Sequence, residues 1–460
     1  MTRYRRGPLL VLPALAVAIA LLLASCGGGG GNDNGGTDTP GTPGGTATIT
    51  VWHSMPSIAE STLQAMVDEF NGSQTQYRVE LVYQGGYTES LNKLISSIDS
   101  GNIPDIIQLS DVATQIMVDS EEVTPVQRFI DDEDYDLSDF EPKAIDYYTI
   151  DGDLYAMPFN LSGPVLYYDR QAFTDAGLDP DRPPRTLDEM RDAAQKLVDR
   201  PNAQPEGSGL AIEPSPWFFE NMLAKSGALY VNNDNGRSGR ADEALFAGPE
   251  GQEIIEWWAG MVHDGLAYDA NDSTDAMLRL ASGNASMAIA STAALRGAIA
   301  GITLLERDPS QYDVAPLPGP EGNGGIALGG AAFWVLERSS EQEQQGAWEL
   351  LKFLSSPEQQ ARWHADTGYF PSRVSALDQP AAVKARQDFP QFNIALQQLH
   401  DSPETPATAG ALVGPFNEVR DILKQALESV LAGAGDPAAA LQQAADQASQ
   451  IMQDYNRTAP

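Results

Sequence analysis

Strand-like and helix-like stretches alternate along the chain from residue 47 onward, and this order limits the possible folds more than any other feature. Residues 47–52 (ATITVW) and 105–109 (DIIQL) are short apolar runs typical of strands, and residues 77–83 (YRVELVY) alternate between two faces. Helical apolar stripes lie between these runs. Strands that are joined through helices run parallel, in a sheet that the helices cover. The order therefore predicts an α/β protein.

The first of these helices has an apolar face made by Ile58, Met66, Val67 and Phe70. Residues 57–60 (SIAE) place a serine three residues before a glutamate, which is the capping-box pattern. We therefore expect the helix to begin with this serine as its cap and to bury all four apolar side chains.

A second region with the same signals begins near Pro158, so that both regions are expected to contain mostly parallel sheets. The chain has 460 residues, which is enough for about two or three domains. The predicted elements of the second region are strands at 164–169 and 331–337, and helices that begin at the capping box 186–189 and cover 248–266, 340–355 and 416–455.

The composition excludes several classes of function. Asp and Glu number 64 against 28 Lys and Arg, and the resulting formal charge of −36 repels nucleic acid. The single cysteine rules out an internal disulfide and a cysteine-rich metal site. The four histidines, His53, His263, His364 and His400, are far apart in the sequence. We therefore expect neither a metal site nor a cofactor.

No local catalytic motif is visible, since the chain contains neither a GxSxG elbow nor a thiol beyond the one near its start. The glycine-rich stretch 324–330 (GGIALGG) lacks the Lys and Ser or Thr of a phosphate-binding loop, and it opens a strand. It is either a turn that feeds this strand or a place where the backbone closely approaches a ligand. We expect the protein not to be an enzyme.

The N-terminus has the features of a bacterial lipoprotein signal. Residues 1–25 combine a basic start with an apolar run over 8–23, and small residues precede Cys26. The apolar run is short for a membrane span, although an uncleaved membrane anchor is the alternative. Residues 26–45 are rich in glycine and form a predicted flexible tether. We therefore expect a protein outside the cytoplasmic membrane, periplasmic or at the cell surface, that is anchored by lipid on Cys26.

Aromatic and hydroxyl side chains gather near the ends of several predicted strands. In open α/β sheets, ligands bind beyond the carboxyl ends of the strands. Together with the absence of a catalytic motif, these clusters predict the capture of a small polar solute. The clusters are 52–55 (WHSM), 83–87 (YQGGY), 159–162 (FNLS) and 363–369 (WHADTGY).

With these clusters, the sequence resembles the extracellular solute-binding proteins (family 1) of ABC importers. Within that family it is most similar to the proteins that bind sn-glycerol 3-phosphate or glycerophosphodiesters. The resemblance runs from about residue 52 to 432. It is carried by WHSM (52–55), YQGGY (83–87), GNIPDIIQ (101–108), PFNLSGPVLYYD (158–169), AGLDPDRPPRT (176–186), GGAAFWV (329–335) and WHADTGYFP (363–371).

The resemblance implies the two-lobed (type II) periplasmic-binding-protein fold, in which each lobe is a sheet flanked by helices and the ligand lies between the lobes. One lobe would comprise 46–157 plus 312–362, and the other 158–311 plus 363–460. It also implies a monomer that delivers its ligand to the membrane permease subunits of an ABC importer.

The resemblance also implies a set of ligand-binding residues. Two departures from the family pattern are Asp111, where the family has glutamate, and Pro214, where it has a second tryptophan. The ligand is therefore expected to be glycerol 3-phosphate or a diester such as glycerophosphocholine; the alternatives are an oligosaccharide ligand and, from another class, a secreted phosphodiester hydrolase. The implied ligand-binding residues are Tyr87, Asp111, Ser162, Trp217, Ser291, Gly330, Tyr369 and Arg420.

Chemically, these residues suit a phosphate ester. Arg420 could grip two phosphate oxygens through its planar fork, and Asp111 could accept from glycerol hydroxyls. The tyrosines and serines would be hydroxyl donors, and the Gly330 amide would be an unobstructed one. Trp217 could lie against the carbon skeleton of the ligand.

Overall fold

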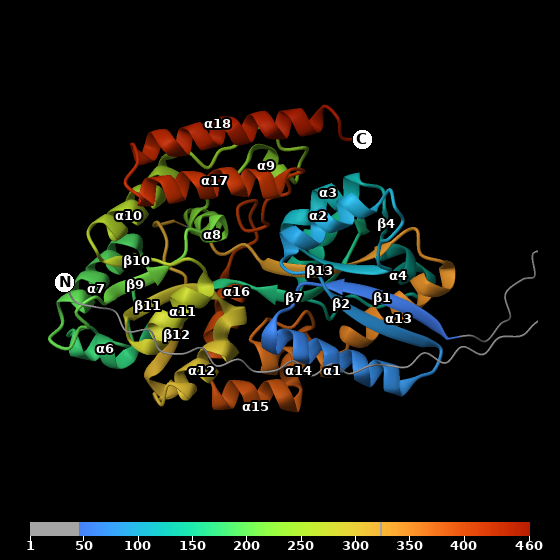
Figure 1. Cartoon of the computed structure of the whole chain (residues 1–460), viewed down its shortest axis with the longest axis horizontal. Coiled ribbons are helices and arrows are strands. Elements are labelled where there is room, and N and C mark those ends of the chain that lie inside the picture. The colour runs from blue at the N-terminus through green and yellow to red at the C-terminus, as the bar shows by residue number, and fades with distance from the viewer. Residues whose placement is uncertain (1–45, 323) are drawn as a thin grey trace, which may run out of the picture. The chain divides into compact units, whose positions relative to one another are not determined.

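The computed structural model describes residues 46–322 and 324–460, and Gly45–Pro460 forms one compact unit (Figure 1). The predicted signal peptide 1–25, Cys26 and the predicted tether lie outside the described residues. Strands and helices alternate through the described chain, and the α/β fold class is confirmed. Among the described helices, none has the length and apolarity that a membrane span needs.

The first sheet has the strand order β2-β1-β3-β13-β4, with β7 also paired to β13. β1 runs parallel to β2 and β3, whereas β13 runs antiparallel to β3, β4 and β7. The strands are β1 (Ala47–His53), β2 (Tyr77–Tyr83), β3 (Ile106–Ser110), β4 (Val123–Thr124), β7 (Met157–Ser162) and β13 (Gly329–Leu336).

The second sheet has the order β10-β9-β11-β8-β12. β9 pairs in parallel with β10 and β11, and β8 pairs antiparallel with β11 and β12. Its strands are β8 (Pro164–Asp169), β9 (Ser208–Ile212), β10 (Ala267–Asp269), β11 (Ala285–Ser291) and β12 (Tyr312–Pro316), and β5 (Thr149–Ile150) and β6 (Asp153–Leu154) form a separate hairpin.

The prediction of mostly parallel sheets is therefore wrong, because each sheet contains two parallel pairs and at least as many antiparallel ones. The reason is that strands reach each sheet from the other one. β7 in the first sheet is followed after Gly163 by β8 in the second, and β12 in the second precedes β13 in the first. The lobe boundaries implied by the resemblance remain a prediction.

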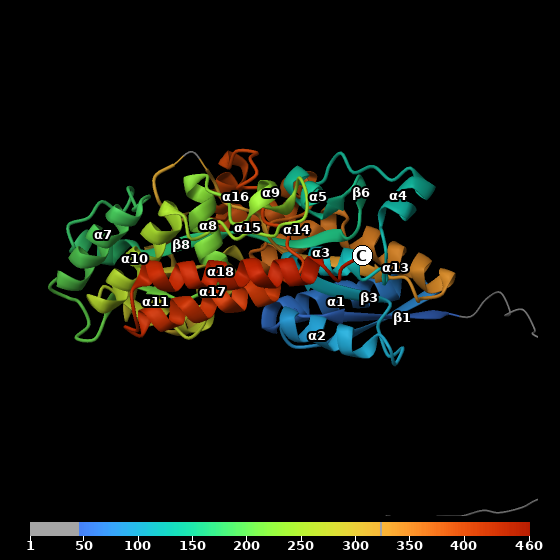
Figure 2. The ribbon, with the colours of Figure 1, turned by 90° about the horizontal axis from the view of Figure 1, so that it is seen from above.

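Helices cover both sheets: α1, α2, α5 and α13 contact strands of the first, and α7, α10, α11 and α16 contact strands of the second. Figures 1 and 2 both show α17 and α18 side by side. The helices are α1 (Ser57–Ser73), α2 (Tyr87–Ser97), α3 (Thr114–Asp119), α4 (Gln127–Glu133), α5 (Pro142–Tyr148), α6 (Arg170–Asp175), α7 (Leu187–Asp199), α8 (Pro216–Ser226), α9 (Asn232–Gly236), α10 (Pro249–His263), α11 (Ser273–Ser282), α12 (Leu295–Leu304), α13 (Glu341–Leu354), α14 (Pro357–Thr367), α15 (Pro380–Asp388), α16 (Gln391–Asp401), α17 (Phe416–Leu431) and α18 (Pro437–Asn456).

The start of α1 differs from the prediction. Ser57 has φ 55, in the left-handed region, and Pro56 occupies the cap position without a side-chain hydrogen bond. An N-cap residue needs an extended backbone, so Ser57 cannot be the cap. Ile58 in this first turn is 42% exposed, whereas Met66, Val67 and Phe70 are buried as predicted. The capping box predicted at Thr186 is confirmed, since both of its hydrogen bonds form.

Strand β8 shows how the second sheet is packed in the interior of the protein. Every residue of β8 is buried. Leu166 and Tyr168 belong to one hydrophobic cluster, and Val165 and Tyr167 belong to another. Because successive side chains of a strand point to opposite faces, both faces of this sheet are covered by apolar packing.

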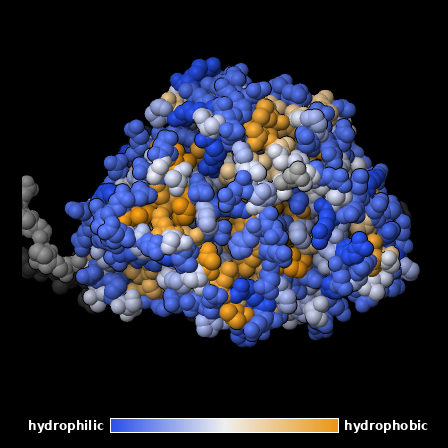
Figure 3. Space-filling model, turned by 180° about the vertical axis from the view of Figure 1, so that it is seen from behind, coloured by the Kyte–Doolittle hydropathy of each residue, from blue (hydrophilic) through white to orange (hydrophobic). Residues whose placement is uncertain are grey.

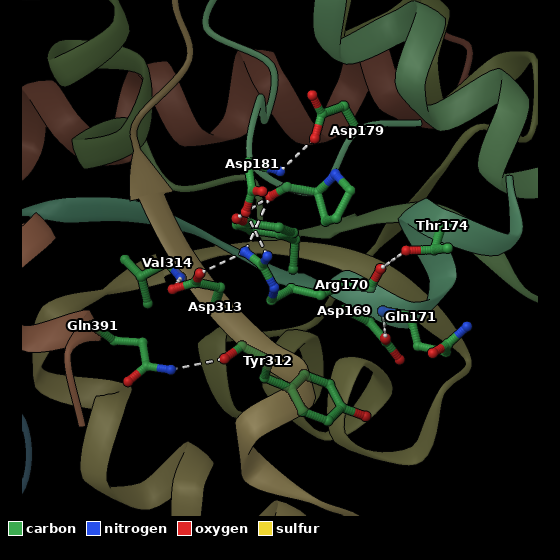
Figure 4. Close-up of polar contacts among 12 residues, drawn as sticks. Asp169, Arg170, Gln171, Thr174, Asp179, Asp181, Tyr312, Asp313, Val314 and Gln391 are labelled. Atoms are coloured by element: carbon green, nitrogen blue, oxygen red, sulfur yellow. Dashed lines mark hydrogen bonds and ion pairs between the residues drawn. The ribbon is translucent and has the colours of Figure 1, made fainter. Parts of the chain in front are cut away.

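The outer edge of the second sheet is closed by side chains around β12 (Figure 4). Arg170 pairs with Asp181 at 2.5 Å and with Asp313 at 3.0 Å, and Gln391 donates to the Tyr312 carbonyl at 2.8 Å. The Gln391 contact occupies a backbone carbonyl of this edge strand, and such contacts hinder pairing with another chain. The face shown in Figure 3 is mostly hydrophilic, with separate apolar patches, in keeping with the charge of −36.

Candidate ligand-binding cavity

A cavity of about 560 Å³ is lined by residues from both sheets and from the helices that follow their strands. It brings together all eight residues implied by the resemblance, although they span more than three hundred positions of the chain. Those residues are Tyr87, Asp111, Ser162, Trp217, Ser291, Gly330, Tyr369 and Arg420.

Strand ends deliver several of these side chains. Ser162 is the last residue of β7, Ser291 is the last residue of β11, and Asp111 directly follows β3. Helix starts deliver others, since Tyr87 opens α2 and Trp217 lies in the first turn of α8. The cavity therefore has the position expected for a ligand site in an α/β protein, beyond the carboxyl ends of strands.

Gly330 and Gly329 pack closely against other parts of the chain. The φ of Gly330, 135°, lies in a region that favours glycine, and an added Cβ would lie 2.1 Å from the Asn160 carbonyl oxygen. A Cβ on Gly329 would lie 2.8 Å from the Trp217 ring. The groups approached are strand β7 and a cavity-lining tryptophan of the same chain, and close backbone approach to a ligand stays a prediction.

Arg420 is already paired in this cavity, which the sequence did not predict. Its Nε donates to Glu220 Oε1 at 2.8 Å, and its Nη2 donates to Glu220 Oε2 at 2.5 Å. Asp111 Oδ2 lies 3.8 Å from the same Nη2. One edge of the guanidinium is therefore occupied, and a ligand would meet only the remaining N–H groups.

Burial affects the pKa of all three charged side chains of this cluster, Asp111, Glu220 and Arg420. Burial raises the pKa of Asp111 and of Glu220, while Arg420 works in the opposite direction on both. Burial alone would lower the pKa of Arg420, but the carboxylates of Glu220 and Asp111 outweigh it and the pKa is raised. With both carboxylates ionised, the cluster carries one negative charge in excess.

Tyr87 is hydrogen-bonded to a pair of buried amide side chains. Asn160 Nδ2 donates to the Tyr87 hydroxyl at 3.0 Å, and Gln108 Nε2 donates to Asn160 Oδ1 at 2.6 Å. Asn160 and Tyr87 both counteract the effect of burial on the pKa of Tyr369. Burial is the main cause of a raised pKa in both phenols, so both keep their hydrogen at neutral pH.

The sequence analysis missed several residues at the site. Glu220 lies one helical turn after Trp217 on α8, and this i, i+3 spacing is the signal that could have found it. Pro214 does not line the cavity, although Ser215 and Pro216 do. Within 46–322 and 324–460, no group of three acidic, histidine or cysteine side chains could hold a metal ion. Other lining residues that were not predicted are Glu89, Ser110, Asn160, Asn417, Asp421 and Lys424.

Comparison with known proteins gives matches over most of the chain. The family described as bacterial extracellular solute-binding protein matches residues 65–391. The sn-glycerol-3-phosphate-binding periplasmic protein UgpB of Salmonella typhimurium is 30% identical over 419 residues, which cover 89% of this chain and 93% of that protein. UgpB of Escherichia coli K12 is 30% identical over 420 residues, covering 89% of this chain and 94% of the relative.

Solved structures show the same fold. UgpB from Mycobacterium tuberculosis in complex with glycerophosphocholine has a TM-score of 0.77 at 22% identity, covering 90% of this chain and 100% of that one. The GacH receptor of Streptomyces glaucescens, solved unliganded and in complex with acarbose, has a TM-score of 0.75 at 19% identity, covering 89% and 99%. At these identities the likeness concerns the fold alone.

Proposed function

The chain belongs to the bacterial extracellular solute-binding proteins, and from this premise we propose that it captures a glycerophosphodiester or sn-glycerol 3-phosphate for an ABC importer. The observation that carries the proposal is the cavity itself. Eight residues taken one by one from the resemblance to glycerol-3-phosphate binders line a single space of about 560 Å³. That volume is within the range of small-molecule sites. The relatives named as glycerol-3-phosphate-binding proteins support the same ligand class.

Helix starts at the cavity support a phosphate-containing ligand. Tyr87 is the first residue of α2, Trp217 lies in the first turn of α8, and Asn417 lies in the first turn of α17; all three line the cavity. The free N–H groups and the dipole at a helix N-terminus favour an anion. The Ser162 and Ser291 hydroxyls add donors at the same cavity.

The charged side chains at the cavity favour a phosphodiester that carries its own cation. A dianionic monoester meets more repulsion here than a zwitterion such as glycerophosphocholine. The negative charges of acidic side chains could attract the quaternary ammonium group of such a ligand. The charged lining residues are Glu89, Asp111 and Asp421 on the negative side and Arg420 and Lys424 on the positive side, with Glu220 adding a further negative charge behind Arg420.

An oligosaccharide is the second candidate, and one observation favours it. Asp111 and Glu220 place two carboxylates around Arg420, and Trp217 lies beside them at the cavity. Carboxylates that accept from hydroxyls and an aromatic ring that covers carbon atoms also suit a sugar. The test below separates this candidate from the phosphodiester.

In this proposal the protein works outside the cytoplasmic membrane as a monomer that is anchored through lipid on Cys26. It hands the ligand unchanged to the membrane permease subunits and is not an enzyme. No cofactor takes part. Incubation with glycerophosphocholine should therefore release no free choline.

Mass spectrometry of small molecules that co-purify with the full chain tests the proposal, followed by calorimetry. We expect glycerophosphocholine or a related diester to co-purify and to bind more tightly than glycerol 3-phosphate. Maltotriose serves as the sugar probe. Binding of maltotriose, with no heat from either phosphate ligand, would overturn the phosphate assignment in favour of the second candidate. Release of free choline would instead point to the hydrolase.

A further inference from the structure

Asp119, the last residue of α3, holds a buried contact that does not line the ligand cavity. Its carboxylate accepts from Arg240 Nη1 at 2.8 Å and Nη2 at 2.9 Å, and from the Tyr455 hydroxyl at 2.8 Å. Gln115, one turn earlier in α3, donates to it at 2.7 Å. The Asp119 side chain is only 6% exposed. Four donors, two of them from one planar guanidinium, give this carboxylate a fixed position.

The two partners of Asp119 come from the other side of the protein. Met117 of α3 packs in the hydrophobic cluster that contains residues of β1, β3 and β13 in the first sheet. Met452 of α18 and Ala241, which follows Arg240, belong to the cluster of the second sheet. Figures 1 and 2 both show the end of α18 beside α3. The Asp119 contacts therefore tie helices of one sheet to those of the other.

The segment that ends at Asp119 begins with a cavity residue. Asp111 opens the short 3₁₀ helix Asp111–Ala113, which runs directly into α3. Asp111 Oδ2 lies 3.8 Å from Arg420 Nη2, which is too long for a hydrogen bond. This contact alone holds the two side chains weakly, so their spacing depends on how the elements that carry them are fixed.

Tyr455 connects the tie to the helix that carries Arg420. Its ring packs on Gly414, two residues before α17, so closely that an added Cβ on Gly414 would lie 2.1 Å from Tyr455 Cε1. α17 packs along α18 and also contacts the 3₁₀ helix that Asp111 opens. The Asp119 contacts thus hold both the segment of Asp111 and the helix of Arg420.

We propose that Asp119 is a positioning residue that fixes the spacing between Asp111 and Arg420 in the cavity. Arg240 and Tyr455 are its partners in that role. An acceptor beside a cation suits a ligand whose hydroxyl and phosphate lie a few bonds apart, and a spacing that is set before the ligand arrives avoids the cost of ordering both groups on binding. This inference deepens the proposed function and rests on this cavity being the ligand site.

Crystal structures of the ligand-free wild type and of Asp119→Asn test the positioning directly. An asparagine cannot accept from both guanidinium N–H groups, because one end of its amide is a donor. We expect the distance from Asp111 Oδ2 to Arg420 Nη2 to stay near 3.8 Å in the wild type and to be clearly longer in the variant. An unchanged distance would overturn the inference, whichever ligand the protein binds. Tyr455→Phe, which keeps the ring on Gly414, should lengthen the same distance and serves if Asp119→Asn does not fold.

A double-mutant cycle tests the consequence for binding. In the wild-type background, Asp111→Ala should weaken glycerophosphocholine binding by roughly tenfold, since a charged acceptor is lost. In the Asp119→Asn background the same change should weaken binding by less than about threefold, because Asp111 is no longer held where the ligand needs it. A purely structural role of Asp119 would leave the effect of Asp111→Ala equal in both backgrounds, and this result would overturn the inference.

Asp169→Asn is the matched control. The Asp169 side chain is 7% exposed and pairs with Arg307 Nη2 at 3.0 Å. Asp169 ends β8 and Arg307 precedes β12, so this buried pair lies within the second sheet, and neither residue lines the cavity. Asp111→Ala should keep its full effect in this background. A loss of that effect would overturn the inference, since any broken buried ion pair would then suffice. Failure of the wild-type protein to bind either phosphate ligand would instead refute the proposed function, and the distance in the crystals would still decide the positioning.

Discussion

Replacing Glu220 by glutamine should move the preference of the cavity from a zwitterionic phosphodiester toward a dianionic monoester. The two Glu220 oxygens accept from Arg420 at 2.8 and 2.5 Å. Glutamine has the same shape and keeps one oxygen for Arg420, but it removes one negative charge from a cluster that has one in excess. The ligand with the greater negative charge gains more from that removal.

The size of the change follows from the spacing of the charges. A phosphate oxygen on the free edge of the guanidinium would lie about 7 Å from the carboxylate on the other edge, if the hydrogen bonds have ordinary lengths. At an effective dielectric constant of about 20, two unit charges at that distance interact by about 2 kcal/mol. Glycerol 3-phosphate carries one negative charge more on its phosphate than glycerophosphocholine does. The ratio of the two affinities should therefore shift by roughly 30-fold toward glycerol 3-phosphate.

Calorimetry with both ligands at about pH 7.5, where the monoester is mostly a dianion, measures this ratio in the wild type and in Glu220→Gln. Glu253→Gln is the control, because Glu253 is exposed on α10 and does not line the cavity, yet its replacement changes the net charge equally. Its affinity ratio should stay at the wild-type value. An equal change of both affinities in Glu220→Gln would refute the charge argument.

Three further predictions follow from the same structure, and a fourth follows from the sequence. Acidification from about pH 8 to 5 should bring the two phosphate affinities closer in calorimetry, because burial raises the pKa of both carboxyls beside Arg420 and the monoester gains a proton near a pKa of about 6. Arg420→Lys should weaken phosphodiester binding by roughly tenfold or more, because a lysine ammonium lacks the planar guanidinium that can bond Glu220 on one edge and a phosphate on another. An unchanged affinity would show that Arg420 does not contact the ligand. Gly330→Ala should lower the free energy of unfolding by about 1–3 kcal/mol in urea titration, whereas Gly297→Ala, whose Cβ would meet nothing, should not lower it. Cys26→Ser should abolish labelling by fatty acid and leave an unprocessed precursor on gels.

Local patterns predicted the elements well where the signal lies within a few residues. The predicted strand 164–169 coincides with β8, and the capping box at Thr186 opens α7. The start of α1 failed because Ser57 takes a left-handed conformation, which the capping pattern does not encode. Strand direction failed for a similar reason, because antiparallel pairs such as β7 with β13 join segments that lie far apart in the chain.

The candidate site also differs between what local sequence patterns predict and what depends on distant parts of the chain. Motif resemblance predicted eight ligand-binding residues; all eight line the cavity, and their contacts with a ligand stay a prediction. It did not predict that one edge of Arg420 is taken by Glu220, since the two residues lie 200 positions apart. Nor did it predict that Tyr87 accepts from Asn160, because hydrogen-bond direction depends on the backbone N–H of Ser54, directly after β1 and far from both residues in the sequence. Residue identity is local information, whereas charge balance and donor direction arise only after folding.

The cavity places its donors and its carboxylates on different elements, and this limits the ligands that can fill it. The hydrogen bonds from Gln108 in β3 and Asn160 in β7 of the first sheet end at the Tyr87 hydroxyl, which keeps its own hydrogen for another acceptor. Arg420 and Glu220 come from α17 and α8, and Asp111 Oδ2 lies 3.8 Å from Arg420 Nη2. Glu220 is already paired with Arg420, but a ligand with acceptor oxygens alone donates nothing to Asp111, and a ligand with donors alone leaves the hydrogens of the cavity hydroxyls unmatched. A glycerophosphodiester has acceptor oxygens on its phosphate and donor hydroxyls on its glycerol a few bonds away, so that one molecule satisfies both parts of the cavity.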